Sequence, residues 1–133
     1  MKTKKTISGL LRITIAIILL QTLYFKFTAH PDSVHIFSEL GVEPWGRIAL
    51  GIIELITAAL ILIPRSQIIG IFLSLGIILG AIFSHVLVIG FNVSNDGGGL
   101  FTLAIIVFLS AMTYIVMNWS ELISLLNSII KRN

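Results

Sequence analysis

Two residues of this 133-residue chain could exchange protons inside an apolar environment. Glu54 lies in the middle of the run WGRIALGIIELITAALILIP, and His85 lies near the end of the next apolar run. An ionisable side chain at the depth of a bilayer centre is costly, so such groups usually face a bundle interior, a partner or a water-filled pocket. A buried carboxyl group and an imidazole can exchange protons near neutral pH. Glu54 and His85 are therefore a candidate catalytic, proton-handling pair.

Other polar residues of the apolar runs are candidates for lining a binding pocket beside this pair. They are Arg12, Gln21, Tyr24, Lys26 and Arg47. The helical rise of about 1.5 Å per residue places Glu54 near mid-depth and most of the other polar residues in one half of the membrane. Lys26 and Arg47 lie near the outer ends of their runs, where long side chains can extend to the membrane surface. The pattern predicts an outward-facing polar pocket with Glu54 at its floor.

Small residues accompany Glu54 and recur in the following run. Gly51 and Ala58 lie on the same helix face as Glu54, which predicts that the carboxyl group points into a helix bundle and not into lipid. A second small-residue stripe repeats every four residues and predicts a seam where two helices pack closely. This stripe consists of Gly76, Gly80 and Ser84.

The elements that must hold these side chains are membrane-spanning helices. Apolar residues make up 56% of the chain and charged residues only 11%, with a mean hydropathy of +1.05, whereas soluble domains carry about 25% charged residues. Four apolar runs approach the length of about 20 residues that crosses a bilayer. They are residues 7–29, 45–64, 67–91 and 98–118. The expected fold is all-α, a polytopic membrane four-helix bundle that forms a single domain over residues 1–133.

Two shorter amphipathic helices are predicted at the membrane surfaces. In HPDSVHIFSELG, Pro31 suits a first helical position and Gly41 can adopt the left-handed conformation that ends a helix, so a short interfacial helix should follow the first span. The segment after Asn118 has one apolar and one polar face and predicts an amphipathic C-terminal helix. Asn118 and Glu121 have the spacing of a capping box.

The basic residues predict how the chain is oriented in the membrane. They gather before the first span (MKTKK), at Arg65 between the second and third spans, and at the C-terminal end, while the other two connections are acidic. The positive-inside rule then places both termini in the cytoplasm of a multi-pass protein, and a bacterial inner membrane is the expected location.

The distribution of charge and the absence of cysteine exclude several classes of function. The net charge of +3 is spread over the ends of segments and forms no basic stripe, so nucleic-acid binding is not expected. The chain has no cysteine, which excludes thiolate metal sites and catalysis by its own thiols. No metal cluster, nucleotide-binding loop or other cofactor motif is evident. The expected partner common to every hypothesis is the lipid bilayer.

Five short motifs follow one another in a fixed order along the chain. They are Leu11-Arg12, then YFKF at 24–27, FSELG at 37–41 before Pro44, GIIEL at 51–55 and GAIFSH at 80–85. This order resembles the DoxX-like family of small four-helix membrane proteins, over residues 7–117. The resemblance implies a four-helix fold and a link to quinone-dependent oxidation of sulfur compounds and to membrane redox assemblies. It marks four polar positions for testing, namely Arg12, Lys26, Glu54 and His85.

Three functional hypotheses are open at this point. The resemblance favours a subunit or accessory of a membrane redox system, which would bind a quinone in the pocket and contact other membrane redox proteins. A carrier of protons or small solutes would use the same pocket as an oligomer, because four helices hardly enclose a wide pore. A non-catalytic scaffold or assembly factor would use the polar residues as buried hydrogen-bonding groups. The sequence does not decide whether the chain is an enzyme.

Overall fold

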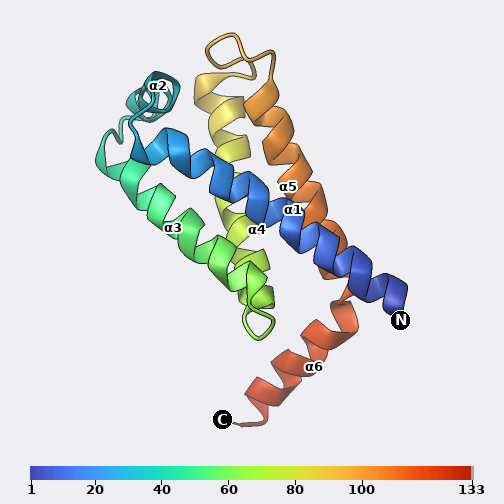
Figure 1. Cartoon of the computed structure of the whole chain (residues 1–133). Helices are drawn as coiled ribbons and strands as arrows, with labels where there is room; N and C mark the ends of the chain where they lie inside the picture. The colour runs from blue at the N-terminus through green and yellow to red at the C-terminus, as the bar shows by residue number, and fades with distance from the viewer. Residues whose placement is uncertain (133) are drawn as a thin grey trace.

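The structure is a computed structural model that describes residues 1–132 and is helical almost throughout (Figure 1). These residues form no strand. The helices are α1 (Lys2–Phe27), α2 (Pro31–Glu39), α3 (Trp45–Leu62), α4 (Gln67–Ser84), the π-helical segment η1 (His85–Ile89), α5 (Gly99–Met117) and α6 (Trp119–Ile130). Helices α1, α3, α4 with η1, and α5 are each long and apolar enough to cross a membrane. The predicted membrane four-helix bundle is confirmed.

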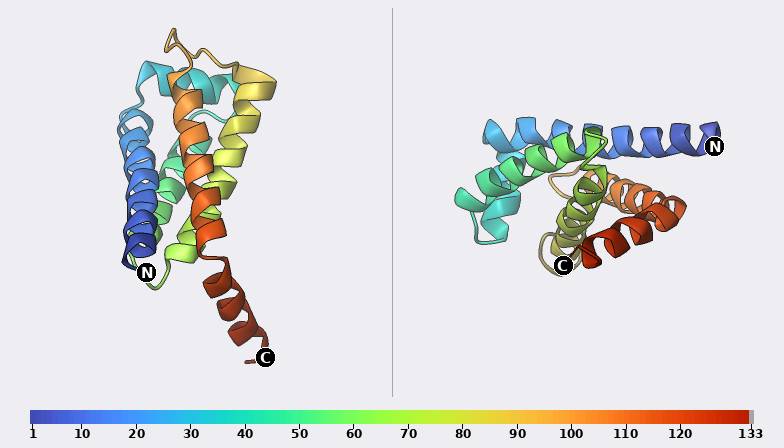
Figure 2. Two further views of the ribbon diagram at one scale, coloured as in Figure 1. Left: turned by 90° about the vertical axis from the view of Figure 1, so that its right-hand side faces the viewer. Right: turned by 90° about the horizontal axis from the view of Figure 1, so that it is seen from below.

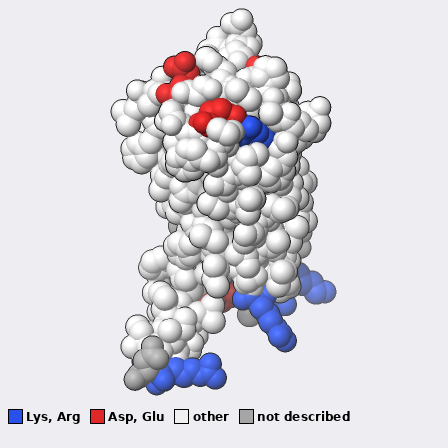
Figure 3. Space-filling model, turned by 90° about the vertical axis from the view of Figure 1, so that its left-hand side faces the viewer, with Lys and Arg blue, Asp and Glu red and all other residues white. Residues whose placement is uncertain are grey.

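The four long helices pack in a ring in which α1 lies between α3 and α5, and α4 closes the ring on the other side. The best-packed core lies in the half of the bundle nearer the chain termini, where Ile15, Ile61 and Val107 are fully buried. Both termini lie at this same end of the molecule (Figure 2). On the face drawn in Figure 3, the middle carries no charged side chain, as contact with lipid tails requires.

Helices α3 and α4 meet closely at their connecting turn and then diverge towards the other end of the bundle (Figure 1). At the turn, a Cβ atom on Gly70 would lie 2.6 Å from the backbone nitrogen of Ile61, so only glycine permits this approach. Helix α2 packs against α1, α3 and η1 at the divergent end. Its termini follow the prediction, since Pro31 lies in the first turn and Gly41 has a φ of +73° after the last.

Helix α6 is a separate helix that extends away from the bundle beyond α5 (Figures 1 and 2). The predicted capping box is wrong, because the Asn118 side chain makes no capping hydrogen bond to α6. Its amide instead donates to Ser8 Oγ at 3.2 Å and to the Tyr114 carbonyl oxygen at 2.8 Å. The side chain is thus turned back towards α1 and α5, and the chain bends at this residue. Ile129 and Ile130 of the predicted apolar face are exposed.

The loop between η1 and α5 is organised by one carboxylate. Asp96 Oδ1 accepts hydrogen bonds from the backbone N–H groups of Val93 and Gly98, and Oδ2 accepts one from Leu100 at 2.8 Å. The N–H of Leu100 is the largest cause that lowers the pKa of Asp96 below its ordinary value of 3.8; loss of hydration opposes this effect, and the other backbone donors add to it. The ionised carboxylate therefore holds the start of α5.

The substitution Asp96→Ala should destabilise the fold by about 1 kcal/mol at neutral pH, as loss of a helix-capping side chain does. Because the pKa of Asp96 is lower in the folded protein, its contribution to stability is present above pH 3.8 and is lost as the pH falls through the folded value. Thermal unfolding in detergent should therefore show a difference between the variant and the parent that shrinks on acidification. The control variant Glu39→Ala removes an exposed carboxylate that accepts no hydrogen bond within residues 1–132, so the comparison separates the loss of these hydrogen bonds from the loss of a surface charge.

Candidate functional site

The centre of the candidate site is a buried ion pair between α1 and α3. Lys26 Nζ lies 2.9 Å from Glu54 Oε2, and the Thr22 hydroxyl donates to the same oxygen at 2.9 Å. Glu54 is 5% exposed and Lys26 is 9% exposed. Side chains on a helix lean towards its N-terminus, so Lys26 reaches from the last turn of α1 down to Glu54. The expectation that Lys26 extends outward to the membrane surface is therefore wrong.

Arg47 forms a second buried pair, which clamps the end of α1. Its Nε lies 2.9 Å from Glu43 Oε1, and its Nη2 lies 2.8 Å from the same oxygen. Its Nη1 donates to the carbonyl oxygen of Lys26, one of the last-turn carbonyls that lack a partner within a helix. Arg47 is 6% exposed and neither extends to the membrane surface nor lines a cavity beside Glu54, so both placements predicted for it are wrong.

His85 opens the π-helical segment and is buried beside α5. Its Nδ1 lies 2.7 Å from the carbonyl oxygen of Gly90, and its ring packs edge-on against Phe101 with 5.5 Å between the centroids. Because a carbonyl oxygen only accepts, Nδ1 must carry the hydrogen. In the neutral imidazole Nε2 is then the acceptor, and it makes no hydrogen bond within residues 1–132.

Glu54, Lys26 and His85 line one cavity of about 420 Å³, here called the central cavity. It lies between the diverging parts of α3 and α4, with α1 and α5 on the other sides and Phe37 of α2 among its lining residues. Most of its walls are apolar, and its volume falls within the range of small-molecule sites. The structure thus brings the two predicted proton-handling residues to one space, without a direct hydrogen bond between them.

The stripe of Gly76, Gly80 and Ser84 is not the predicted packing seam. A Cβ atom on Gly76 or Gly80 would meet no other atom within 4 Å, and all three residues line the central cavity. The divergence of α3 from α4 is the physical reason, because it leaves this face of α4 without a partner helix. The absent side chains enlarge the cavity.

A second cavity of about 340 Å³ shares five lining residues with the central cavity and is here called the outer cavity. The shared residues are Thr22, Lys26, Ile36, Leu100 and Leu103. Gln21, predicted as a pocket residue, lines the outer cavity together with the carboxylates Asp32 and Asp96.

The two remaining predicted pocket residues lie elsewhere. Tyr24 is 65% exposed and lines neither cavity, so its predicted placement is wrong. It follows the buried Leu23 by one residue, and the helical turn of about 100° per residue directs it outward. Arg12 lies near the opposite end of the bundle, where it donates a hydrogen bond to Gln67 Oε1, and it does not reach the central cavity.

A family model described as the DoxX-like family matches residues 10–112 of the chain. The chain belongs to the DoxX-like family. In this DoxX-like protein the matched region contains the Lys26–Glu54 pair, the Arg47 clamp and His85, whereas α6 lies beyond it. No curated protein and no solved structure has significant similarity to the chain.

Sequence reasoning missed two features of the site. Thr22 was not a predicted site residue, although its position four residues before Lys26 places both on one face of α1. Thr57 of α3 was not singled out either; it is fully buried, and its hydroxyl has no hydrogen-bond partner within the described chain. No signal in the sequence separates such a threonine from an ordinary core residue.

The ion pair should show strong coupling in a double-mutant cycle. Lys26→Met or Glu54→Leu alone leaves one charge buried without its partner and should destabilise the protein by about 3–5 kcal/mol. The double variant should be more stable than either single variant. Denaturant unfolding of the purified protein in detergent measures these differences. The exposed pair Lys4–Glu121 is the matched control, with a coupling energy of at most about 1 kcal/mol; equal coupling in the two pairs would contradict the assignment of a buried pair.

The glycines of α4 should respond to alanine in opposite directions. Gly80→Ala should stabilise the protein by up to about 0.5–1 kcal/mol, because the new methyl group enters open space and alanine favours helix. Gly70→Ala should destabilise it, because the methyl group would meet the backbone of α3. Thermal unfolding in detergent measures both. Destabilisation by Gly80→Ala would mean that a helix does pack on this face.

Proposed function

We propose that this DoxX-like protein binds a lipid-soluble molecule of the quinone class in its central cavity, as a subunit or accessory of a membrane redox system. The central cavity itself carries the proposal: about 420 Å³ inside the bundle, walled mainly by apolar side chains, with Lys26, Glu54 and His85 among its few polar ones. Small-molecule sites commonly combine an apolar cleft with a few converging polar groups. The family membership supports the proposal, since the resemblance to DoxX-like proteins implies membrane redox assemblies.

The polar groups of the cavity suit a ring that carries two carbonyl oxygens. The Lys26 ammonium has three N–H donors, so it can donate a hydrogen bond to one such oxygen besides the one directed at Glu54, while the apolar walls contact the ring and its hydrocarbon tail. Glu54 and the imidazole of His85 can hold or release protons. A quinone, when bound, takes up two electrons and two protons. The electrons come from a partner protein of the redox class, and this chain contributes binding and proton exchange.

The divergence of α3 and α4 provides a route from the bilayer into the cavity. Gly76 and Gly80 are exposed and have no side chains to block this side of α4. A lipid-soluble molecule therefore enters laterally between the helices, and α2 covers the cavity towards the membrane surface.

The charges of the two ends support the orientation with both termini in the cytoplasm. At the end away from the termini, Lys26 and Arg47 are each paired with a buried or half-buried glutamate. The terminal end carries the remaining cations, which are Lys2, Lys4, Lys5, Arg12, Arg65, Lys131 and Arg132. Such an excess at one end fits the positive-inside rule.

A non-catalytic scaffold is the second candidate, and one observation favours it. Lys26 and Glu54 neutralise each other, and so do Arg47 and Glu43. With the hydrogen bond from Arg47 to the Lys26 carbonyl oxygen, these contacts join α1 to α3 and to the segment that precedes α3. Buried polar groups of this kind can serve helix packing alone. A scaffold would bind no quinone, and its function would depend on exposed surfaces of α2 or α6.

Binding of a short-chain quinone to the purified full-length chain in detergent tests the proposal. Gly80→Leu should weaken binding about tenfold or more, because its side chain fills the cavity, and a tenfold change corresponds to about 1.4 kcal/mol. Ala49→Leu adds the same bulk to an exposed position of α3 that lines no cavity and should leave binding unchanged. Titration followed by isothermal calorimetry measures both dissociation constants.

Two outcomes would contradict the proposal. One is the absence of quinone binding by the parent protein together with the absence of any co-purified lipid-soluble redox molecule in mass spectrometry. The other is equal binding by the parent and Gly80→Leu, which would place the ligand outside the central cavity. Either result would leave the scaffold as the better account.

A further inference from the structure

A third cavity, of about 360 Å³, lies at the end of the bundle where the termini are and is here called the terminal cavity. It is bounded by the first turns of α1, the turn between α3 and α4, and the junction of α5 with α6. It shares no lining residue with the central or the outer cavity. Its cationic lining residues are Lys4, Lys5 and Arg12.

Arg12 is a half-buried guanidinium that has no carboxylate partner within residues 1–132. Its Nη1 donates to Gln67 Oε1, which fixes the side chain against the start of α4, and its other nitrogens donate no hydrogen bond to the described chain. The two other cations inside the bundle, Lys26 and Arg47, are each paired with a glutamate. The Arg12 guanidinium therefore has free N–H donors, which lie in one plane and can bind two oxygens of a phosphate group at once.

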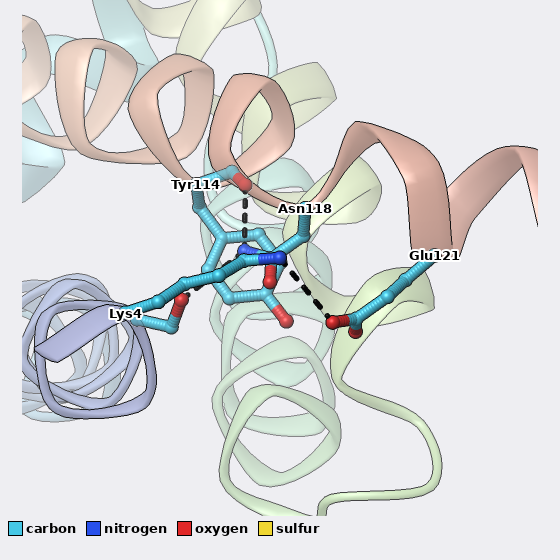
Figure 4. A network of polar contacts seen from close by, with 5 residues as sticks. Lys4, Tyr114, Asn118 and Glu121 are labelled. Carbon is cyan, nitrogen blue, oxygen red and sulfur yellow. Dashed lines mark hydrogen bonds and ion pairs between the residues drawn. The ribbon is translucent and has the colours of Figure 1, made fainter. Parts of the chain in front are cut away.

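Tyr114 adds a neutral donor to the same space. The residue is 3% exposed and lines the terminal cavity, and its hydroxyl makes no hydrogen bond within the described chain. Figure 4 shows Tyr114 and Asn118 beside Lys4, with Asn118 held by its bonds to Ser8 and to the Tyr114 carbonyl oxygen. The Tyr114 hydroxyl is therefore free to donate a hydrogen bond to a ligand in the terminal cavity.

The charge of the terminal cavity favours an anion. Its one acidic lining residue, Glu121, is paired with Lys4 at 3.4 Å, so Lys5 and Arg12 are left without a carboxylate. The cavity also adjoins the N-terminal turns of α1, where the helix dipole carries partial positive charge. Helix α6, which begins at the cavity and carries an exposed apolar face, suits the surface of a lipid leaflet.

We propose that the terminal cavity binds a phosphate group, with Arg12 as its main ligand and the Tyr114 hydroxyl and Lys5 as further donors. The phosphate belongs either to the headgroup of an anionic phospholipid or to a free phosphate ester, because both present the same oxygens to these donors. The site is independent of the central cavity, so it does not rest on quinone binding.

The test uses the purified full-length chain in a neutral detergent, titrated with phosphatidylglycerol, phosphatidylcholine or glycerol 3-phosphate. Native mass spectrometry measures the dissociation constants. Phosphatidylglycerol should bind, and Arg12→Gln should weaken its binding about tenfold, as loss of a hydrogen bond to a charged group does. Tyr114→Phe should weaken this binding severalfold. It removes only the hydroxyl and keeps the aromatic ring, so it tests the site even where Arg12→Gln does not fold. Arg65→Gln removes a cation from the same end without lining the cavity and should change binding less than twofold.

The three ligands separate the sources of the phosphate. Binding of phosphatidylglycerol alone supports a lipid headgroup, and binding of glycerol 3-phosphate with the same dependence on Arg12 supports a free phosphate ester. Equal binding of phosphatidylcholine and phosphatidylglycerol without dependence on Arg12 would overturn the proposal, because the acyl chains would then explain the affinity. Equal losses in Arg12→Gln and Arg65→Gln would also overturn it, because general surface attraction to the cations would then explain the affinity. Unchanged binding in both Arg12→Gln and Tyr114→Phe would overturn it as well.

Discussion

The arrangement of this protein depends on the cost of a carboxylate placed halfway through an apolar helix. Glu54 can occupy that depth because Lys26 and Thr22 reach it from α1, which fixes the relative height of α1 and α3. Arg47 then fastens the end of α1 to the segment before α3. Lys26 and Arg47, two cations expected at the membrane surface, therefore form ion pairs inside the bundle. Their contacts hold α1 and α3 together, and the other helices pack against these two.

The central cavity results from a difference in helix packing between the two ends of the bundle. The core around Ile15, Ile61 and Val107 and the tight turn at Gly70 hold the bundle together at one end. Towards the other end α3 and α4 diverge, and α2 packs there instead of a further long helix. The polar groups of the site consequently lie in the central cavity, which the divergence of α3 and α4 leaves open inside the bundle and which α2 covers.

Composition and periodicity predicted the four spans, the short helix after the first span and the inward direction of Glu54, because each depends on local pattern and on the cost of exposing charge to lipid. Patterns along one helix could not reveal which helices separate. The glycines of α4 therefore suggested close packing where the structure has a cavity. Tyr24 and Arg47 were misplaced for a similar reason, since their directions depend on helix rotation and on the partner Glu43. The break at Asn118 depends on Ser8, which is 110 residues away.

Lys26 is the one charged residue among the five that line both the central and the outer cavities; the others are Thr22, Ile36, Leu100 and Leu103. The position of Lys26 in this boundary is held by its ion pair with Glu54, so an electrostatic contact fixes one part of a boundary that is otherwise steric. Neutralising that carboxyl group, by a proton or by a competing ligand, would free the long, flexible side chain of Lys26 and widen the connection between the two cavities. The width of the connection between the central and the outer cavities would then depend on the charge of Glu54.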